Sequence, residues 1–185
     1  MPLVVLVNGI SATGKTTVAR ELASRFRLPL FAKDAVKERL FDTVGSSDRE
    51  WAHRLSGATH AVLNYVMEEE LRCGRGFIVE ANFNPSFDAE KFSRWQALYG
   101  ALLVQVLCYA EGEVVFERFR RRVESGQRHP GHCDGGSVEA WREYLMAGKC
   151  APLAVKGPVI EVDTTDFFAV DYDALAQEIA GLSRE

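Results

Sequence analysis

Short apolar runs alternate along the chain with longer segments in which apolar residues recur every three or four positions. The apolar runs predict strands over 3–8, 28–32, 77–83, 102–109 and 159–162. The periodic segments predict helices over 15–26, 35–42, 48–72, 88–99, 112–124 and 138–147, and a closing helix that contains Tyr172, Leu175, Ala176 and Ile179 after an Asp171 N-cap. Strands that alternate with helices are typical of an α/β fold, and near-continuous apolar strands indicate a parallel sheet covered on both faces.

Further details of the pattern concern two of the predicted helices and one loop. The apolar positions of helix 48–72 with helical spacing are Trp51, Leu55, Ala58, Val62 and Val66, and the helix ends before Gly74 and Gly76. In helix 112–124 the side chains expected to face inward are Val115, Phe119 and Val123. Residues 125–137 are polar and rich in glycine, which predicts a mobile loop.

Composition narrows the class of protein. The 185 residues are 47% hydrophobic and 26% charged, which fits a single globular domain over 1–185. The net charge of −4 argues against nucleic-acid or membrane affinity over the whole surface, although a local basic groove stays open. Cysteines at 73, 108, 133 and 150 form no C-x-x-C pair, and residues 1–7 lack the pattern of a signal peptide. We therefore expect a cytoplasmic protein with reduced thiols; its oligomeric state stays open.

Gly9-Ile-Ser-Ala-Thr-Gly14-Lys15-Thr16 matches the G-x-x-x-x-G-K-[ST] phosphate loop, between a predicted strand and a predicted helix. The two glycines allow a phosphate to approach the backbone, and the helix adds its positive N-terminal end. Lys15 is expected to bind the β- and γ-phosphates, and the Thr16 hydroxyl to bind Mg²⁺. The expected nucleotide-binding residues in this segment are Gly9, Ser11, Ala12, Thr13, Gly14, Lys15, Thr16 and Thr17. The motif alone does not separate a kinase from an ATPase or a switch.

Asp34 follows the second predicted strand. Ligands of parallel sheets bind at the carboxyl ends of the strands, so this carboxylate is expected beside the phosphate loop. There it is placed to accept the proton of an attacking hydroxyl, as phosphoryl transfer requires. The alternative is that Asp34 only caps helix 35–42, and both roles are compatible.

The third predicted strand ends in polar residues. Glu80 and Asn82 are two residues apart and are expected on one side of the strand. We expect Glu80 to hold Mg²⁺ through water and Asn82 to hydrogen-bond a substrate. The alternative is a partly exposed strand end with no such role.

Arginines gather in an otherwise acidic chain. Arg118 and Arg122 are four residues apart on helix 112–124, with Arg121 beside them, and Arg128 follows in the loop. Such a cluster favours a lid, over about 118–147, that neutralises the transferring phosphoryl group. The alternative is a solvated helix face whose partners are Glu117 and Glu124.

A metal site near the lid is not expected. His129, His132 and Cys133 lie close in sequence, but no fourth ligand has suitable spacing. His129 is expected to shape the lid or to contact substrate, and the sequence leaves open whether His129 or His132 does so.

The phosphate loop, the strand that ends in Asp34, "VEANF" at 79–83 and the R-F-x-x-R and R-H-P-G-H stretches resemble those of small P-loop kinases. The group resembled spans the zeta-toxin and chloramphenicol-phosphotransferase-like kinases and the kinase domains of polynucleotide kinases. The resemblance implies a three-layer α/β/α P-loop fold with a five-stranded parallel sheet in the order 2-3-1-4-5. It also implies Asp34 as general base, Arg118 and Arg122 on the adenine side, and Arg128 on the phosphates. The preference for ATP rests on it too, and no N-K-x-D guanine motif is present.

Two departures bear on the phosphate acceptor. Glu80 to Pro85 lack the arginine with which nucleoside monophosphate kinases hold a monophosphate, and Lys37 stands where polynucleotide kinases tend to have arginine. The leading hypothesis is therefore an ATP- and Mg²⁺-dependent kinase of a small hydroxylated molecule, with Lys15, Asp34 and Arg128 as catalytic residues. The alternatives are a polynucleotide or nucleotide kinase and a non-catalytic ATP-dependent switch. The acceptor is expected near Asp34, Lys37, Trp51, His53, Arg54, Glu80 and Asn82.

Overall fold

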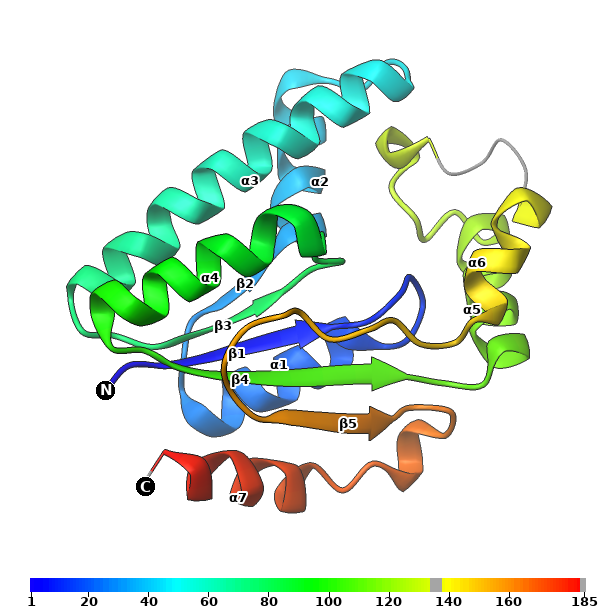
Figure 1. Ribbon diagram of the computed structural model, residues 1–185. Coiled ribbons are helices and arrows are strands. Elements are labelled where there is room, and N and C mark those ends of the chain that lie inside the picture. Colours follow the sequence, from blue (N-terminus) through cyan, green and yellow to red (C-terminus); the bar gives the residue numbers. More distant parts are fainter. Residues whose placement is uncertain (134–137, 184–185) are drawn as a thin grey trace.

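The computed structural model describes residues 1–133 and 138–183, and its centre is a five-stranded parallel sheet (Figure 1). The strands are β1 (Leu3–Asn8), β2 (Leu30–Ala32), β3 (Phe77–Glu80), β4 (Leu102–Tyr109) and β5 (Val159–Asp163). They lie in the order β2-β3-β1-β4-β5, which confirms the order that the resemblance implied. Because all pairs are parallel, the carboxyl ends of the strands meet at one edge.

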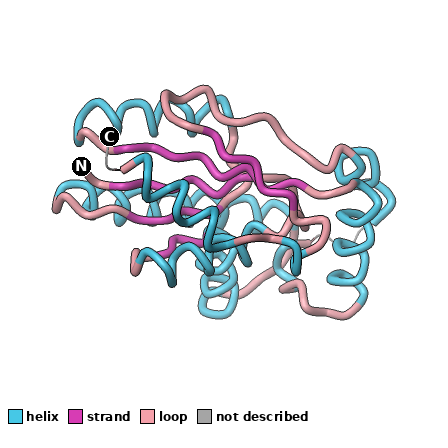
Figure 2. The backbone as a smooth tube through the Cα atoms, turned by 90° about the horizontal axis from the view of Figure 1, so that it is seen from below, coloured by secondary structure: helices cyan, strands magenta, loops and turns pink. Residues whose placement is uncertain are grey.

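Helices cover both faces of the sheet and complete three layers (Figures 1 and 2). One face carries α3 (Arg49–Arg72) and α4 (Pro85–Tyr99), and the other carries α1 (Lys15–Phe26) and α7 (Tyr172–Leu182). The remaining elements are α2 (Lys33–Val44), α5 (Gly112–Glu124), α6 (Arg142–Met146) and the 3₁₀ turns η1 (Pro130–His132), η3 (Val138–Trp141) and η4 (Phe167–Ala169). Among the described residues, no helix combines the length and hydropathy that crossing a membrane requires.

Alternating side chains of each strand supply two cores, one under each helical layer. Val5 and Val7 of β1 pack with α1 and α7, whereas Val4 and Leu6 pack with α3 and α4. The second core contains the fully buried or almost fully buried rings of Phe77, Phe92 and Trp95. Burial of both faces explains why the strands read as continuous apolar runs.

The segment between α6 and β5 is attached to the sheet by one buried polar side chain. Gln105 of β4 is 2% exposed; its Nε2 donates to the Leu153 carbonyl at 3.1 Å, and its Oε1 accepts from the Leu153 N–H at 2.8 Å. Both polar atoms of the amide are satisfied in this way, as burial requires. The contact holds the segment over the face that α3 and α4 cover.

Several predicted boundaries were wrong near the strand ends. β2 begins at Leu30 instead of residue 28, and α2 begins directly after it at Lys33. β3 ends at Glu80, so Asn82 lies in a loop and shares no strand face with Glu80. Helix α4 begins at Pro85, with Asn84 as its N-cap, three residues before the predicted start. The Asn-Pro pair at 84–85 is an N-terminal helix signal that the apolar spacing did not include.

Two helical predictions also needed correction. In α3, Ala58, Val62 and Val66 are exposed, and the buried positions are Ala52, Leu55, Thr59, Leu63, Met67 and Leu71. Both sets have helical spacing, so periodicity alone could not select the buried face. The predicted helix 138–147 is a 3₁₀ turn, η3, followed by the short α6. Residues 134–137 of the predicted loop and lid lie outside the described residues.

Candidate active site

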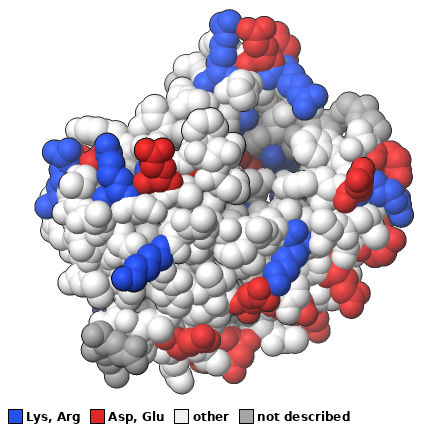
Figure 3. All heavy atoms as spheres, viewed as in Figure 1, with Lys and Arg blue, Asp and Glu red and all other residues white. Residues whose placement is uncertain are grey.

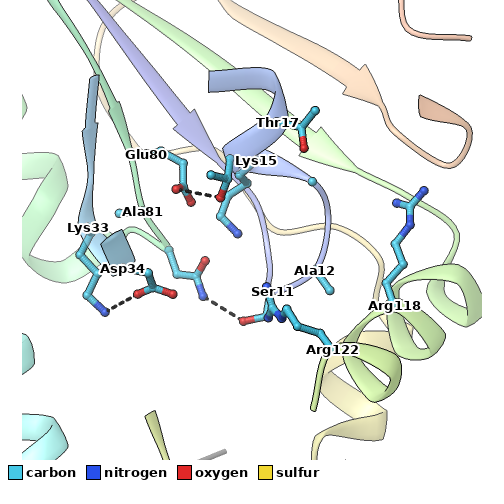
Figure 4. A pocket seen from close by; sticks show the side chains of 13 residues that line it. Ser11, Ala12, Lys15, Thr17, Lys33, Asp34, Glu80, Ala81, Arg118 and Arg122 are labelled. Atoms are coloured by element: carbon cyan, nitrogen blue, oxygen red, sulfur yellow. Dashed lines mark hydrogen bonds and ion pairs between the residues drawn. The ribbon is translucent and has the colours of Figure 1, made fainter. Parts of the chain in front are cut away.

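The phosphate loop joins β1 to α1 at the carboxyl edge of the sheet (Figure 4). Gly14 and Ala12 adopt left-handed backbone conformations, with φ of 77° and 66°. Such alternation turns successive N–H groups toward one side, which makes a concave anion site. Gly9 packs against the sheet so closely that an added Cβ would lie 2.5 Å from the Cys108 carbonyl oxygen. The glycine at position 9 is therefore required by the close approach of two backbones.

The first turn of α1 supplies further donors. The first N–H groups of a helix have no intrahelical acceptor. The N–H groups of Gly14 to Thr16 are therefore available to an anion bound at this site. The Lys15 ammonium lies in the same hollow and donates to the Ile10 carbonyl at 2.8 Å. Burial lowers the pKa of Lys15, while the charge of Glu80 opposes that shift. A phosphate oxygen would offer this buried cation a stronger partner than a carbonyl.

Thr16 and Glu80 meet beneath the loop. Thr16 Oγ1 donates to Glu80 Oε2 at 3.1 Å, and Glu80 is the last residue of β3, directly opposite Val7 of β1. Burial raises the pKa of Glu80, and the charge of Lys15 opposes the rise. A hydroxyl and a carboxylate side by side are the oxygen ligands that Mg²⁺ accepts, directly or through water. The residues present therefore fit the metal that phosphoryl transfer uses.

Asp34 lies on the wall of the same hollow. Ala32 pairs with Glu80, so the next residues of the chain emerge beside the end of β3. Asp34 Oδ1 accepts from Lys33 Nζ at 3.2 Å, and Oδ2 accepts from Arg128 Nη1 at 2.9 Å. Burial alone would raise the pKa of Asp34, but the charges of Lys33 and Arg128 and the hydrogen bond hold it well below its ordinary value. The capping alternative was wrong, because Ala32 is the N-cap of α2 and no side chain caps it.

A cavity of about 220 Å³ connects these groups. Figure 4 shows Lys15, Glu80 and Asp34 on one side of the phosphate loop, with Arg118 and Arg122 of α5 on the other. The space-filling view shows a hollow with basic and acidic side chains inside it (Figure 3). The lining residues are Ser11, Ala12, Gly14, Lys15, Thr16, Thr17, Lys33, Asp34, Glu80, Ala81, Asn82, Arg118 and Arg122. Most of the residues predicted for nucleotide binding therefore surround one cavity.

Arg118 marks one end of this cavity. Its Nη2 donates to the carbonyls of Thr164 and Thr165 at 2.9 and 3.0 Å, and its guanidinium lies 4.2 Å from the centre of the Phe167 ring. The Thr164 hydroxyl donates to the Thr13 carbonyl at 2.8 Å, which joins the segment after β5 to the phosphate loop. A guanidinium group beside an aromatic ring can stack on the base of a nucleotide. Sequence reasoning missed Phe167, which is half-buried at the start of η4, because no local signal distinguishes it from other aromatic residues outside the predicted helices and strands.

The structure places the predicted acceptor residues in different surroundings. Asn82 Nδ2 donates to Ser11 Oγ at 3.2 Å, at the cavity. Lys37 is buried, with its ammonium 5.2 Å from the centre of the Phe41 ring. Arg54 is exposed and pairs with Glu50 at 2.8 Å on the surface of α3. Neither Lys37 nor Arg54 is among the residues that line the cavity.

A second cavity, of about 640 Å³, lies between α3 and the beginning of α4. It is lined by His53, Ser56, Gly57, His60, Asn64, Asn84, Phe87, Asp88, Glu90, Lys91 and Arg94. Burial lowers the pKa of His60; the charges of Lys33 and Lys91 lower it further, and those of Asp88 and Asp34 oppose the shift. His60 therefore lines the second cavity within range of the charges of Lys33 and Asp34, which line the first. Sequence reasoning included only His53 of this set, because the cavity depends on how two helices pack.

Comparisons with known proteins agree with this arrangement. A family profile described as "AAA domain" matches residues 4–146. The crystal structure of a kinase candidate from Chloroflexus aurantiacus is 37% identical over 98% of both chains, with a TM-score of 0.91. No curated protein matches the sequence.

More distant solved structures share the fold. A gluconokinase from Sinorhizobium meliloti is 17% identical, over 99% of this chain and 92% of that chain, with a TM-score of 0.52. A shikimate kinase from Bacteroides thetaiotaomicron is 15% identical, over 100% and 99% of the two chains, with a TM-score of 0.52. The profile match and the likeness to the Chloroflexus protein show that the chain belongs to the AAA domain family, with the fold of a small P-loop kinase.

Proposed function

We propose that the protein transfers the γ-phosphate of ATP to a hydroxyl group of a small molecule. The observation that carries the proposal is the Asp34 carboxylate, which lines the same cavity as Lys15 and the phosphate loop. A nucleotide switch needs no acceptor base, whereas a kinase does. The kinase-like fold and its kinase neighbours support nucleotide binding and phosphotransfer in general.

Each part of the cavity has a role in this proposal. The N–H groups of residues 11–16 and the Lys15 ammonium bind the phosphates, while Arg118 with Arg122 holds the adenine end. Thr16 and Glu80 would hold Mg²⁺, which when bound neutralises charge on the β- and γ-phosphates. Lys15 and the N–H groups then stabilise charge that spreads over the transferring group.

The acceptor is proposed to approach from the second cavity. His60, which lines that cavity, is near enough to Lys33 and Asp34 for their charges to act on its pKa, so a hydroxyl that projects from the cavity past His60 would approach the Asp34 carboxylate. Asp34 would accept the hydroxyl proton as the new phosphate ester bond forms and the bond to ADP breaks. His53 and Asn82 keep their proposed contacts with the acceptor, whereas Lys37 and Arg54 lie outside both linings and are not needed for it.

The test is a search for a phosphorylated product. The protein is incubated with Mg-ATP and a fractionated library of metabolites and antibiotics, and mass spectrometry detects added phosphate. Asp34→Asn should lower the transfer rate by about 10²–10⁴-fold, the usual contribution of a general base. Asp173→Asn is the matched control, because Asp173 is exposed on α7 and pairs with Arg25 away from both cavities. Equal product in wild type and Asp34→Asn would refute the role of Asp34.

The remaining alternatives are distinguished by the same assay. Product on oligonucleotide 5′-hydroxyls or on nucleoside monophosphates would establish the polynucleotide or nucleotide kinase, and a steep salt dependence would support a nucleic-acid substrate. Tight ATP binding with a conformational change and no product in any fraction would favour the switch.

A further inference from the structure

Three acidic side chains along α2 meet one arginine and two histidines from one short segment. Asp34, Glu38 and Asp42 are spaced four residues apart and therefore share a helix face. Arg128 Nη1 is 2.9 Å from Asp34 Oδ2, His132 Nε2 is 2.9 Å from Glu38 Oε1, and His129 Nε2 is 3.2 Å from Asp42 Oδ1. We call residues 128–133 the docking segment. The predicted surroundings of Arg128 were phosphates, and the structure instead places its guanidinium on the candidate base.

The docking segment is packed on the helix as well as paired with it. The His129 ring stacks on Phe41 at 5.2 Å and 11°, and the His132 ring meets the edge of Phe41 at 5.6 Å. Gly131 lies on the face of the same ring, where an added Cβ would be 2.6 Å from Phe41 Cγ. Phe41 is itself 3% exposed and packs with Leu55 of α3. The segment is therefore part of a small core with α2 and α3.

Hydrogen bonds determine which form of His129 the segment holds. The Gly131 N–H donates to His129 Nδ1 at 3.0 Å, so Nδ1 carries no proton. Nε2 must then carry the proton that faces Asp42. The turn at Pro130–His132 thus orients the ring, and the ring in turn anchors the turn to α2. Such mutual support leaves the backbone next to Arg128 with little freedom.

The Arg128 contact has a chemical consequence for Asp34. A carboxylate that accepts a charge-assisted hydrogen bond from a guanidinium is a weaker base than a free one. Asp34 lines the cavity that would hold the phosphates, so Arg128 is separated from that cavity by one carboxylate. A polyphosphate carries more negative charge than one carboxylate and binds guanidinium groups in bidentate geometry. Nucleotide binding would therefore attract Arg128 away from Asp34.

We propose that the docking segment positions Arg128 for an exchange of partners, from Asp34 in the empty site to the terminal phosphate in the nucleotide-bound site. In this exchange, Arg128 leaves the Asp34 carboxylate only when the phosphate that is to be transferred is bound. His129 and His132 act in it as positioning residues, through Arg128. This inference rests on the proposed function, but the docked segment and the exchange can be measured without an acceptor.

His132 reports on the exchange because its ring lies among the charges that change. The charged and titratable groups around it are Glu38, Asp34 and Lys37 of α2 and, from its own segment, Arg128 and the His129 ring, whose centre is 6.5 Å away. Burial lowers the pKa of His132, and the charge of Arg128 lowers it further. Departure of Arg128 should therefore raise that pKa.

The experiment is an NMR pH titration of the imidazole signals of wild type, Arg128→Ala, Glu38→Gln and Glu70→Gln. Without nucleotide, we expect the pKa of His132 to be below its ordinary value of about 6.5, to rise in Arg128→Ala and to fall in Glu38→Gln. Glu70→Gln is the matched control, since Glu70 pairs with Arg75 at the opposite end of α3. Addition of Mg²⁺ and a non-hydrolysable ATP analogue should raise the pKa of His132 more in wild type than in Arg128→Ala.

The outcomes separate the steps of the inference. An ordinary His132 pKa that neither Arg128→Ala nor Glu38→Gln changes would show that the segment is not docked in solution. Equal analogue-induced shifts in wild type and Arg128→Ala would show that Arg128 stays on Asp34, and either result overturns the proposal. Absence of any phosphorylated product would refute the proposed function and leave the titration result standing.

Kinetics then test the positioning role once an acceptor is found. Glu38→Gln should lower kcat about tenfold while the KM for ATP changes less than about twofold, because only the alignment of Arg128 is lost. Glu38→Asp should restore part of kcat, since it keeps the charge that faces His132. Equal kcat in wild type and Glu38→Gln would contradict positioning through this contact.

Discussion

The close contact beneath the phosphate loop predicts that Gly9→Ala removes most of the affinity for ATP. A Cβ at this position would lie 2.5 Å from the Cys108 carbonyl oxygen and 2.6 Å from Thr13 Oγ1. The carbonyl cannot turn away, because Cys108 lies in β4 and pairs with Val162 of β5. The loop must shift by about 1 Å instead, since heavy atoms in contact need roughly 3.5 Å between them.

The magnitude follows from that displacement. A shift of about 1 Å in groups that position a phosphate can cost about 100-fold, which corresponds to ~2.7 kcal/mol of binding free energy. Residue 9 also has a φ of 152°, a conformation that alanine adopts only with strain. That strain should lower the free energy of unfolding by about 1–3 kcal/mol, so the variant should remain folded.

The assay is a titration with Mg-ATP by calorimetry, together with circular dichroism and thermal unfolding. Gly181→Ala is the matched control, because nothing lies within 4 Å of a Cβ added at this position in α7. It should keep the affinity for ATP and gain up to about 1 kcal/mol of helix stability. A folded Gly9→Ala variant with the wild-type Kd would refute the assignment of the loop as the nucleotide site.

Three further predictions concern other buried or paired groups. Thr164→Val removes the hydroxyl that donates to the Thr13 carbonyl. Thermal unfolding should show that the free energy of unfolding falls by about 1–3 kcal/mol, and calorimetry should show a weaker affinity for ATP. Unchanged values would contradict a link between the segment after β5 and the phosphate loop. Gln105→Leu leaves the N–H of Leu153 unpaired, whereas the Leu153 carbonyl keeps the Val155 N–H as a donor. Denaturant unfolding should therefore show a loss of about 1–3 kcal/mol, with the affinity for ATP retained. Burial would raise the pKa of Asp34, but the charges of Lys33 and Arg128 hold it below the ordinary value of 3.8. The pairing therefore stabilises the folded protein at pH values above 3.8, and this stabilisation is lost as the pH falls from 3.8 toward the lowered pKa. Urea titrations at several pH values should therefore show wild type and Asp34→Asn converging below about pH 4, and a difference that does not depend on pH would exclude the pairing.

Local signals account for the part of the protein that the sequence predicted. The phosphate loop is one continuous segment whose glycines and lysine act within a few residues of one another, so its position and its context between β1 and α1 were readable directly. The alternation of apolar runs and periodic segments predicted the α/β class, because a sheet buried on both faces requires it. Strand β4 and helix α5 were predicted with the bounds that the structure shows.

Packing between distant segments decided the rest. The exposed positions of α3 have the same helical spacing as its buried ones, and only contact with the sheet distinguishes Val62 from Leu63. Arg128 lies 94 residues from Asp34 in the sequence, and the two meet because Phe41 and Gly131 bring the docking segment onto α2. The sequence by itself determined the phosphate-loop motif and its place between a strand and a helix. The tertiary structure alone decided that Arg128 pairs with Asp34, because electrostatic partners depend on distances in space, and these are determined by non-local burial of apolar side chains.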